Sequence, residues 1–154
     1  MNYTPPQPNP LPRFRGLVLI WLAIISSVVM FFVVSRLLGP AAEEGVSATP
    51  PLFWVFAALG LATFGLSFLL KSRLLAQARQ QRRPEVVSTA YILAFALSEA
   101  SALFGLVSHF VTRSPFSVYL FALAALGLLL HKPKQAHLSE VQGEGNAGGF
   151  GTGL

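Results

Sequence analysis

Cysteine and aspartate are both absent from this chain of 154 residues, and its six acidic residues are all glutamate. Without cysteine the protein has no disulfide, no thiolate metal site, no iron–sulfur cluster and no lipidated cysteine. Charged residues make up 11% of the chain and hydrophobic residues 53%. Because the hydrophobic residues form long blocks without alternation, the composition is typical of a membrane protein that crosses the bilayer several times.

Four hydrophobic blocks approach or reach the length of about 20 helical residues that a hydrocarbon core of about 30 Å requires. They lie at residues 16–35, 52–70, 90–111 and 115–130. We therefore predict an all-α integral membrane protein in which a bundle of four transmembrane helices occupies residues 14–132. The fourth block is the shortest, and Tyr119 and His131 are expected to anchor it at the membrane interfaces.

Basic residues orient the helices, because cytoplasmic loops of membrane proteins carry an excess of lysine and arginine. Nine of the eleven basic residues fall on one side of the predicted bundle: Arg13, Arg15, Lys71, Arg73, Arg79, Arg82, Arg83, Lys132 and Lys134. The other side carries Arg36 and Arg113, with Glu43 and Glu44. The predicted topology therefore places both termini and the loop 71–86 in the cytoplasm. With no recognisable organellar presequence, this pattern favours a bacterial inner membrane.

The loop between the second and third blocks is expected to be mostly helical. Residues 71–83 include many strong helix formers and neither glycine nor proline, so the second helix should project beyond the membrane surface. Pro84 suits the first turn of the next helix. This basic protrusion is the predicted docking surface for a soluble partner or anionic lipid, rather than for nucleic acid. Its docking residues are Arg79, Arg82, Arg83, Pro84 and Glu85.

Both ends of the chain are expected to be disordered tails. Residues 1–13 include five prolines, and residues 133–154 are rich in glycine with little to bury.

Glu99 lies near the middle of the third block, where an ionisable side chain is costly and often marks a functional site. On a helix it lies close to a face of small and polar residues, which we expect to pack against a neighbouring helix. The predicted packing residues are Ala94, Ser98, Ser101 and Gly105 on the third helix, with a matching stripe of Ala58, Ala62 and Gly65 on the second.

Hydroxyl groups are the predicted partners of the Glu99 carboxyl, since no lysine, arginine or histidine lies at the middle of another predicted helix. A hypothetical ion-binding site therefore comprises Glu99, Ser98, Thr63, Ser26 and Ser27.

Other chemistry finds little support in the sequence. His109 and His131 should lie near opposite membrane surfaces, so they cannot share a haem iron. Ser98 and Glu99 are adjacent and project about 100° apart around a helix, so they do not form a nucleophile–base pair. We expect no cofactor, no metal and no catalytic residue, and hence no enzyme.

The stretch FALSEASALFGLV, residues 95–107, resembles the second helix of the c subunits of rotary F- and V-type ATP synthases. In that family a mid-membrane acid precedes an alanine and then an aromatic–glycine–leucine triplet. The corresponding residues here are Glu99, Ala100, Phe104, Gly105 and Leu106. Arg83, Pro84 and Glu85 resemble the polar loop that faces the catalytic head in that family. The resemblance implies that Glu99 binds and releases a proton or sodium ion, and that Arg83 docks to a soluble partner.

Two functions follow from these observations. In the first, the protein is a non-catalytic accessory subunit or small membrane scaffold with a structural Glu99, bound to other membrane subunits or to copies of itself. The alternative is a proton- or sodium-binding subunit with a c-subunit-like carboxylate at Glu99.

Overall fold

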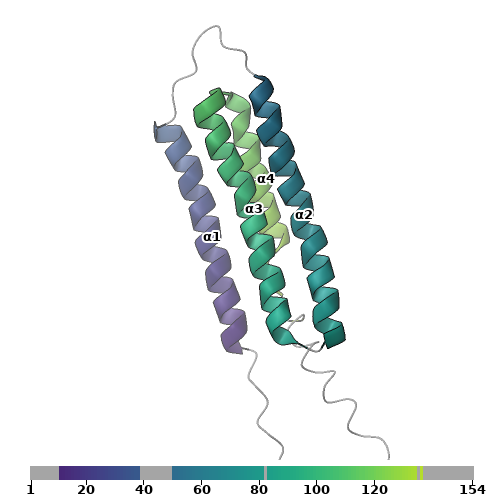
Figure 1. Cartoon of the computed structure of the whole chain (residues 1–154). Helices are drawn as coiled ribbons and strands as arrows, with labels where there is room; N and C mark the ends of the chain where they lie inside the picture. The colour runs from purple at the N-terminus through teal and green to yellow at the C-terminus, as the bar shows by residue number, and fades with distance from the viewer. Residues whose placement is uncertain (1–10, 39–49, 82, 135, 137–154) are drawn as a thin grey trace, which may run out of the picture.

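The structure, a computed structural model, describes residues 11–38, 50–81, 83–134 and 136. Within these residues the chain forms four α-helices and one short 3₁₀ helix (Figure 1). They are α1 (Leu11–Leu38), α2 (Pro51–Gln81), α3 (Pro84–Thr112), η1 (Pro115–Ser117) and α4 (Val118–Leu130). The first three are long and hydrophobic enough to cross a membrane, whereas the stretch Pro115–Leu130 is shorter. The described chain is thus all-helical, with three candidate transmembrane helices.

The long helices extend beyond their hydrophobic blocks. α2 continues to Gln81, so residues 71–81, predicted to be helical, are part of this helix. α1 begins at Leu11, which means that residues 11–13, predicted to be disordered, are helical. Hydrophobicity marks only the part of a helix that suits lipid, and the helix itself continues as long as the backbone allows. The rest of both predicted tails lies outside the described residues, apart from residues 133, 134 and 136.

Short connections make α3 an antiparallel neighbour of both α2 and α4. Arg83 is extended, with φ −108° and ψ 102°, and Pro84 takes the first helical position. At the other end, Arg113 adopts a left-handed conformation with φ 54°, and its amide donates to the His109 carbonyl at 3.1 Å. Ser114 then caps η1 by accepting a hydrogen bond from the Phe116 amide at 3.4 Å. These turns leave little freedom in how the helices pair.

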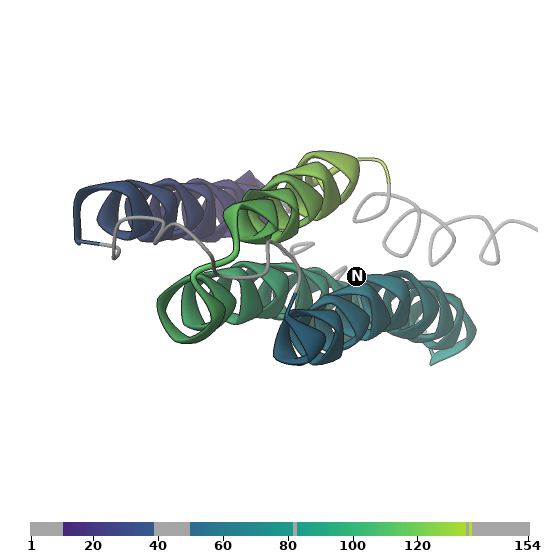
Figure 2. The ribbon, with the colours of Figure 1, turned by 90° about the horizontal axis from the view of Figure 1, so that it is seen from above.

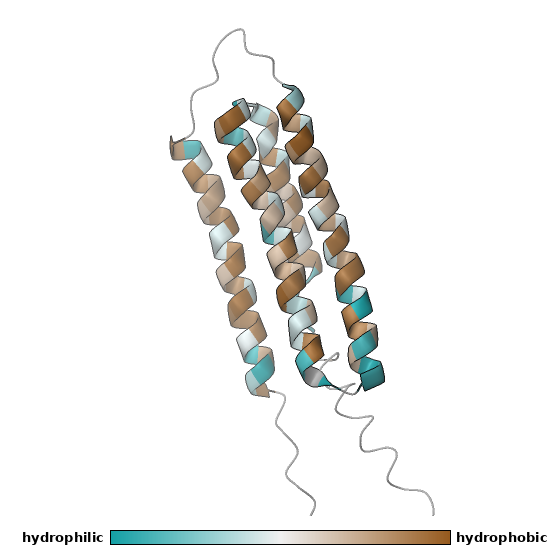
Figure 3. Cartoon of the chain, viewed as in Figure 1, coloured by the Kyte–Doolittle hydropathy of each residue, from teal (hydrophilic) through white to brown (hydrophobic). Residues whose placement is uncertain are grey.

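The helices form two layers, α1 with α4 and α3 with α2 (Figure 2). α3 packs on all three other helices, most extensively on α2, while α1 packs on α3 and α4. Polar residues gather at the end of the bundle where α1 begins and α2 ends (Figure 3). Large hydrophobic side chains face outward along much of the bundle, including Leu19, Leu61 and Leu129. An exposed hydrophobic surface of this extent suits lipid.

Small residues let α3 approach its neighbours closely. Ala94, Ser98, Ser101 and Gly105, the stripe predicted to pack, are all buried. A Cβ placed on Gly127 of α4 would lie only 2.8 Å from the Ser98 hydroxyl oxygen. Such contacts are the packing that membrane helices use in place of large interlocking side chains.

The matching stripe predicted on α2 is wrong. Ala58, Ala62 and Gly65 are exposed, and nothing lies within 4 Å of a Cβ placed on Gly65. Instead, α2 turns Gly60 and Ser67 inward, and both are buried. Small residues occur around several sides of α2, so their spacing by itself could not identify the face that meets α3.

Candidate functional site: the Glu99 contact and the His131 cluster

Glu99 lies between α3 and α1. The position of Glu99 on α3 directs its partly buried side chain toward α1, where the Ser27 hydroxyl hydrogen-bonds to Oε1 of the carboxyl group. Ser27 Oγ also lies 3.0 Å from the carbonyl oxygen of Ile24, one turn earlier on α1. One predicted partner of the carboxyl is therefore in place.

The other three predicted partners bond elsewhere. Ser26 Oγ donates to the Leu22 carbonyl at 3.0 Å, and Ser98 Oγ donates to the Ala94 carbonyl at 2.9 Å. Thr63 Oγ1 lies 3.0 Å from the Gly60 carbonyl and 3.1 Å from Ser101 Oγ. The structure therefore does not bring the five predicted ion-binding residues together. Glu99 faces α1, whereas Ser98 and Thr63 lie on the other side of α3. The prediction grouped these residues by their depth in the membrane, and depth does not tell on which side of a helix a residue lies.

Ser101 is the polar centre of the contact between α2 and α3. Its hydroxyl donates to the Gly60 carbonyl on α2 at 2.9 Å, and Thr63 Oγ1 lies 3.1 Å away. A hydrogen bond to a helix carbonyl is possible only at close approach of the two helices. A Cβ placed on Gly60 would lie 2.7 Å from Leu120 Cδ2, so this glycine also makes room for α4. The predicted small-residue stripe on α3 is thus joined to α2 by hydroxyl groups, with Glu99 outside this contact.

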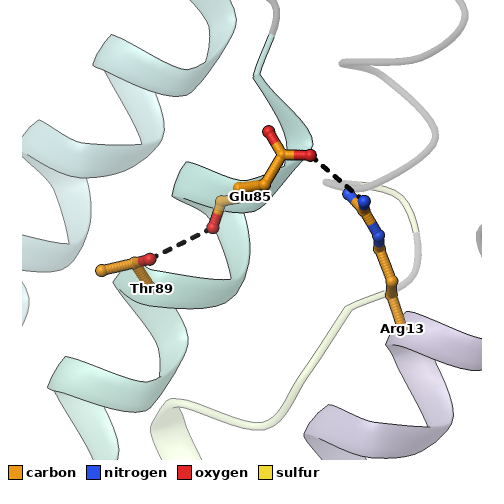
Figure 4. A network of polar contacts seen from close by, with 3 residues as sticks. All are labelled: Arg13, Glu85 and Thr89. Carbon is orange, nitrogen blue, oxygen red and sulfur yellow. Dashed lines mark hydrogen bonds and ion pairs between the residues drawn. The ribbon is translucent and has the colours of Figure 1, made fainter.

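Within the described residues, polar contacts at three positions along α1 join it to α3 and α4. Near its start, Arg13 pairs with Glu85 of α3 at 3.1 Å, and the Thr89 hydroxyl donates to the Glu85 carbonyl at 3.2 Å (Figure 4). The indole N–H of Trp21 donates to the Leu128 carbonyl on α4 at 2.8 Å. The Ser27 contact with Glu99 is the third. Together they fix α1 at successive depths along its length.

The predicted docking residues are only partly described. Arg79 and Arg83 are exposed, and Glu85 is exposed while paired to Arg13. The structure places Pro84 at the first position of α3, and Arg82 lies outside the described residues.

A cluster at the C-terminal end of α4 was not identified from the sequence. His131 was predicted as an interfacial anchor, but only 1% of it is exposed, whereas Tyr119 is 65% exposed. The His131 ring lies 4.3 Å from that of Phe68, between centroids. Ser67 and Lys71 are four residues apart on α2 and share one face, but only the fold brings them to a histidine that follows α4.

The hydrogen bonds of this cluster form a chain in which each group donates to the next, from Lys71 through His131 and Ser67 to the Phe64 carbonyl. The Lys71 ammonium can only donate, so Nδ1 of His131, 3.4 Å away, accepts. In the neutral ring Nε2 then carries the hydrogen and donates to Ser67 Oγ at 2.8 Å. Ser67 in turn donates to the Phe64 carbonyl at 2.6 Å. Every polar atom of the buried ring therefore has a partner.

Metal ligands do not gather in the part of the chain that the structure describes, where no group of three or more histidine, cysteine, aspartate or glutamate residues occurs. His109 lies in the last turn of α3, and His131 directly follows α4.

Comparison with known proteins adds no relative: no protein-family model, no curated protein and no solved structure matches this chain.

Proposed function

We propose that this protein is a non-catalytic membrane scaffold or accessory subunit in which Glu99 is structural and holds α1 against α3. The observation that supports this proposal is the Ser27 contact, which joins the two helices through the Glu99 carboxyl. An interhelical hydrogen bond of this kind contributes about 0.6 to 2 kcal/mol inside a membrane.

Ser27 is held on its own helix while it contacts the other. Its hydroxyl oxygen lies 3.0 Å from the Ile24 carbonyl of α1, and the hydroxyl also hydrogen-bonds to the Glu99 carboxyl of α3. The Ser27 side chain therefore acts as a fixed link between the two helices.

The surroundings of Glu99 give less support to an ion-binding subunit. Hard cations in proteins are held by several oxygen ligands. Of the predicted set, Ser26, Ser98 and Thr63 are bonded to backbone carbonyls of their own helices. One observation favours the alternative of proton or sodium exchange: the Glu99 side chain is only partly buried.

A scaffold also needs surfaces for its partners. The exposed face of α2 carries Ala58, Ala62 and Gly65, over which another membrane helix can approach closely. Partners of this proposed kind are other membrane subunits or copies of the chain itself.

Labelling of Glu99 by a hydrophobic carbodiimide separates the two functions. This reagent reacts with protonated carboxyl groups in apolar surroundings, and mass spectrometry of the Glu99 peptide measures the reaction in native membranes across pH, with and without sodium. As a scaffold, the protein should label less in its native state than after unfolding, and neither sodium nor pH should change the native labelling. Native labelling that sodium suppresses, or that changes reversibly with pH, would favour ion exchange and contradict the proposal.

Matched serine variants sharpen this test. Ser27→Ala removes the contact with Glu99 and should make the carboxyl reactive, whereas Ser26→Ala removes only an exposed bond within α1 and should not. Glu99→Gln should stay folded, since the amide can still donate to Ser27, and it provides the unlabelled reference peptide.

A further inference from the structure

Lys71 lies at the depth of the inner membrane interface. α2 begins at Pro51, and Lys71 is twenty residues further along, which at about 1.5 Å per residue is about 30 Å. That distance equals the thickness of the hydrocarbon core. When the start of α2 lies at the outer interface, Lys71 lies at the opposite, inner interface. Its ammonium group is then at the depth of the lipid phosphate groups.

Tyr91 contacts both Lys71 and the backbone of Lys134 at this depth. The Lys71 nitrogen lies 4.4 Å from the centroid of the Tyr91 ring and 3.4 Å from His131 Nδ1. The Tyr91 hydroxyl accepts a hydrogen bond from the Lys134 amide at 3.2 Å, which fixes the segment after α4 against α3. Lys134 is thereby close enough to Lys71 for the two charges to repel each other.

No carboxylate balances these charges within the residues that the structure describes. Of the two described glutamates, Glu85 pairs with Arg13 and Glu99 bonds to Ser27. Lys71 has three N–H groups, of which one donates to His131, so the ammonium retains hydrogen-bonding capacity for an anion. The basic pair therefore suits an anionic ligand.

We infer that Lys71 and Lys134, placed by Tyr91 and His131, bind the phosphate of an anionic phospholipid from the cytoplasmic leaflet. The depth of Lys71 selects a lipid over a free phosphate ion. Phe68 packs on His131 and is 37% exposed. Leu130, which precedes His131 in the chain, is 54% exposed. These side chains offer an apolar surface for the acyl chains next to the phosphate site.

The test uses the full chain reconstituted in vesicles of phosphatidylglycerol and phosphatidylcholine, with retained lipid measured by native mass spectrometry. The wild-type protein should retain phosphatidylglycerol in preference to phosphatidylcholine. Lys71→Gln should lower that preference about fivefold, the equivalent of about 1 kcal/mol for one basic residue at the surface. Lys134→Gln should lower it as well and serves as the second variant if Lys71→Gln fails to fold.

Arg73→Gln is the matched control, because it removes the same charge from an exposed position two residues along α2. Equal losses in Lys71→Gln and Arg73→Gln would overturn the proposal, since they would indicate a diffuse attraction to the membrane. Release of the retained lipid by millimolar inorganic phosphate would likewise overturn the choice of a lipid. A gain in retention on substituting Glu140 and Glu144, which lie outside the described residues, would mean that a tail carboxylate occupies the site instead.

Discussion

At the scale of single residues, the protein depends on how small its contact residues are. Gly127 faces Ser98 where α4 crosses α3, and Gly105 faces Leu120, whose Cβ would lie 3.0 Å from a Cβ on the glycine. Gly65, by contrast, faces open space on α2. The same residue type thus has different consequences on the two faces of the bundle.

Gly127→Ala should destabilise the protein by about 1 to 3 kcal/mol, the usual cost of overpacking. The added methyl group would lie 2.8 Å from Ser98 Oγ and 3.1 Å from Ser98 Cβ, and the Ser98 hydroxyl is held by the Ala94 carbonyl. Thermal unfolding in a fixed detergent measures the change. Gly65→Ala is the control and should be neutral or slightly stabilising, because alanine favours the helix. If the two variants behave alike, the close contact between α4 and α3 is not present.

At the scale of helices, α1 is the most weakly integrated element. It packs on α3 and α4, and three polar contacts fix its position. In the central contact, the Trp21 indole N–H donates to the Leu128 carbonyl in the last turn of α4. Carbonyl groups in the last turn of a helix have no hydrogen-bond partner within that helix. The exposed Arg13 pair contributes little by itself, since both charges are accessible to water.

Trp21→Phe should loosen α1 while leaving α2, α3 and α4 packed. The variant keeps an aromatic ring but loses the N–H that bonds to Leu128, at a cost of about 1 kcal/mol. Proteolysis at the start of α1 should then be faster in detergent, with fragments read by mass. Trp54→Phe removes an indole that is 61% exposed and packs on Phe53, and it should cleave like the wild type. Equal cleavage of all three proteins would argue against the anchoring role of Trp21.

At the scale of the whole molecule, charge and hydrophobicity agree on an orientation. The polar end of the bundle, seen in Figure 3, is the end that the excess of lysine and arginine assigns to the cytoplasm. α2 and α3 extend past the end of α4 on this side, where the start of α1 lies beside α3 (Figure 1).

Single cysteines test this orientation, and the absence of native cysteine gives a clean background. Gln77→Cys, on the exposed part of α2, should react with a membrane-impermeant maleimide only when the reagent reaches the cytoplasmic face. Ser47→Cys, in the segment between α1 and α2, should react only from the opposite face. The reverse pattern would show that the bundle is inserted the other way round.

The sequence by itself determined the helical class, the positions of the long helices and the continuation of α2 past residue 70, because each depends on local properties. Block length, helix formers and Pro84 are read along the chain without reference to other helices. The sequence also placed Ser27 at the depth of Glu99, as one of four hydroxyl groups between which it could not choose.

Only the tertiary structure decided which faces of these helices meet. α2 carries small residues on several sides, so Gly60 and Ser67 could not be preferred to Ala58, Ala62 and Gly65 before the helices were packed. Likewise, the bonds from His131 to Ser67 and Lys71 join residues about sixty positions apart. The physical reason is that lipid and protein interior are both apolar, so hydrophobicity does not distinguish the inward face of a membrane helix from the outward one.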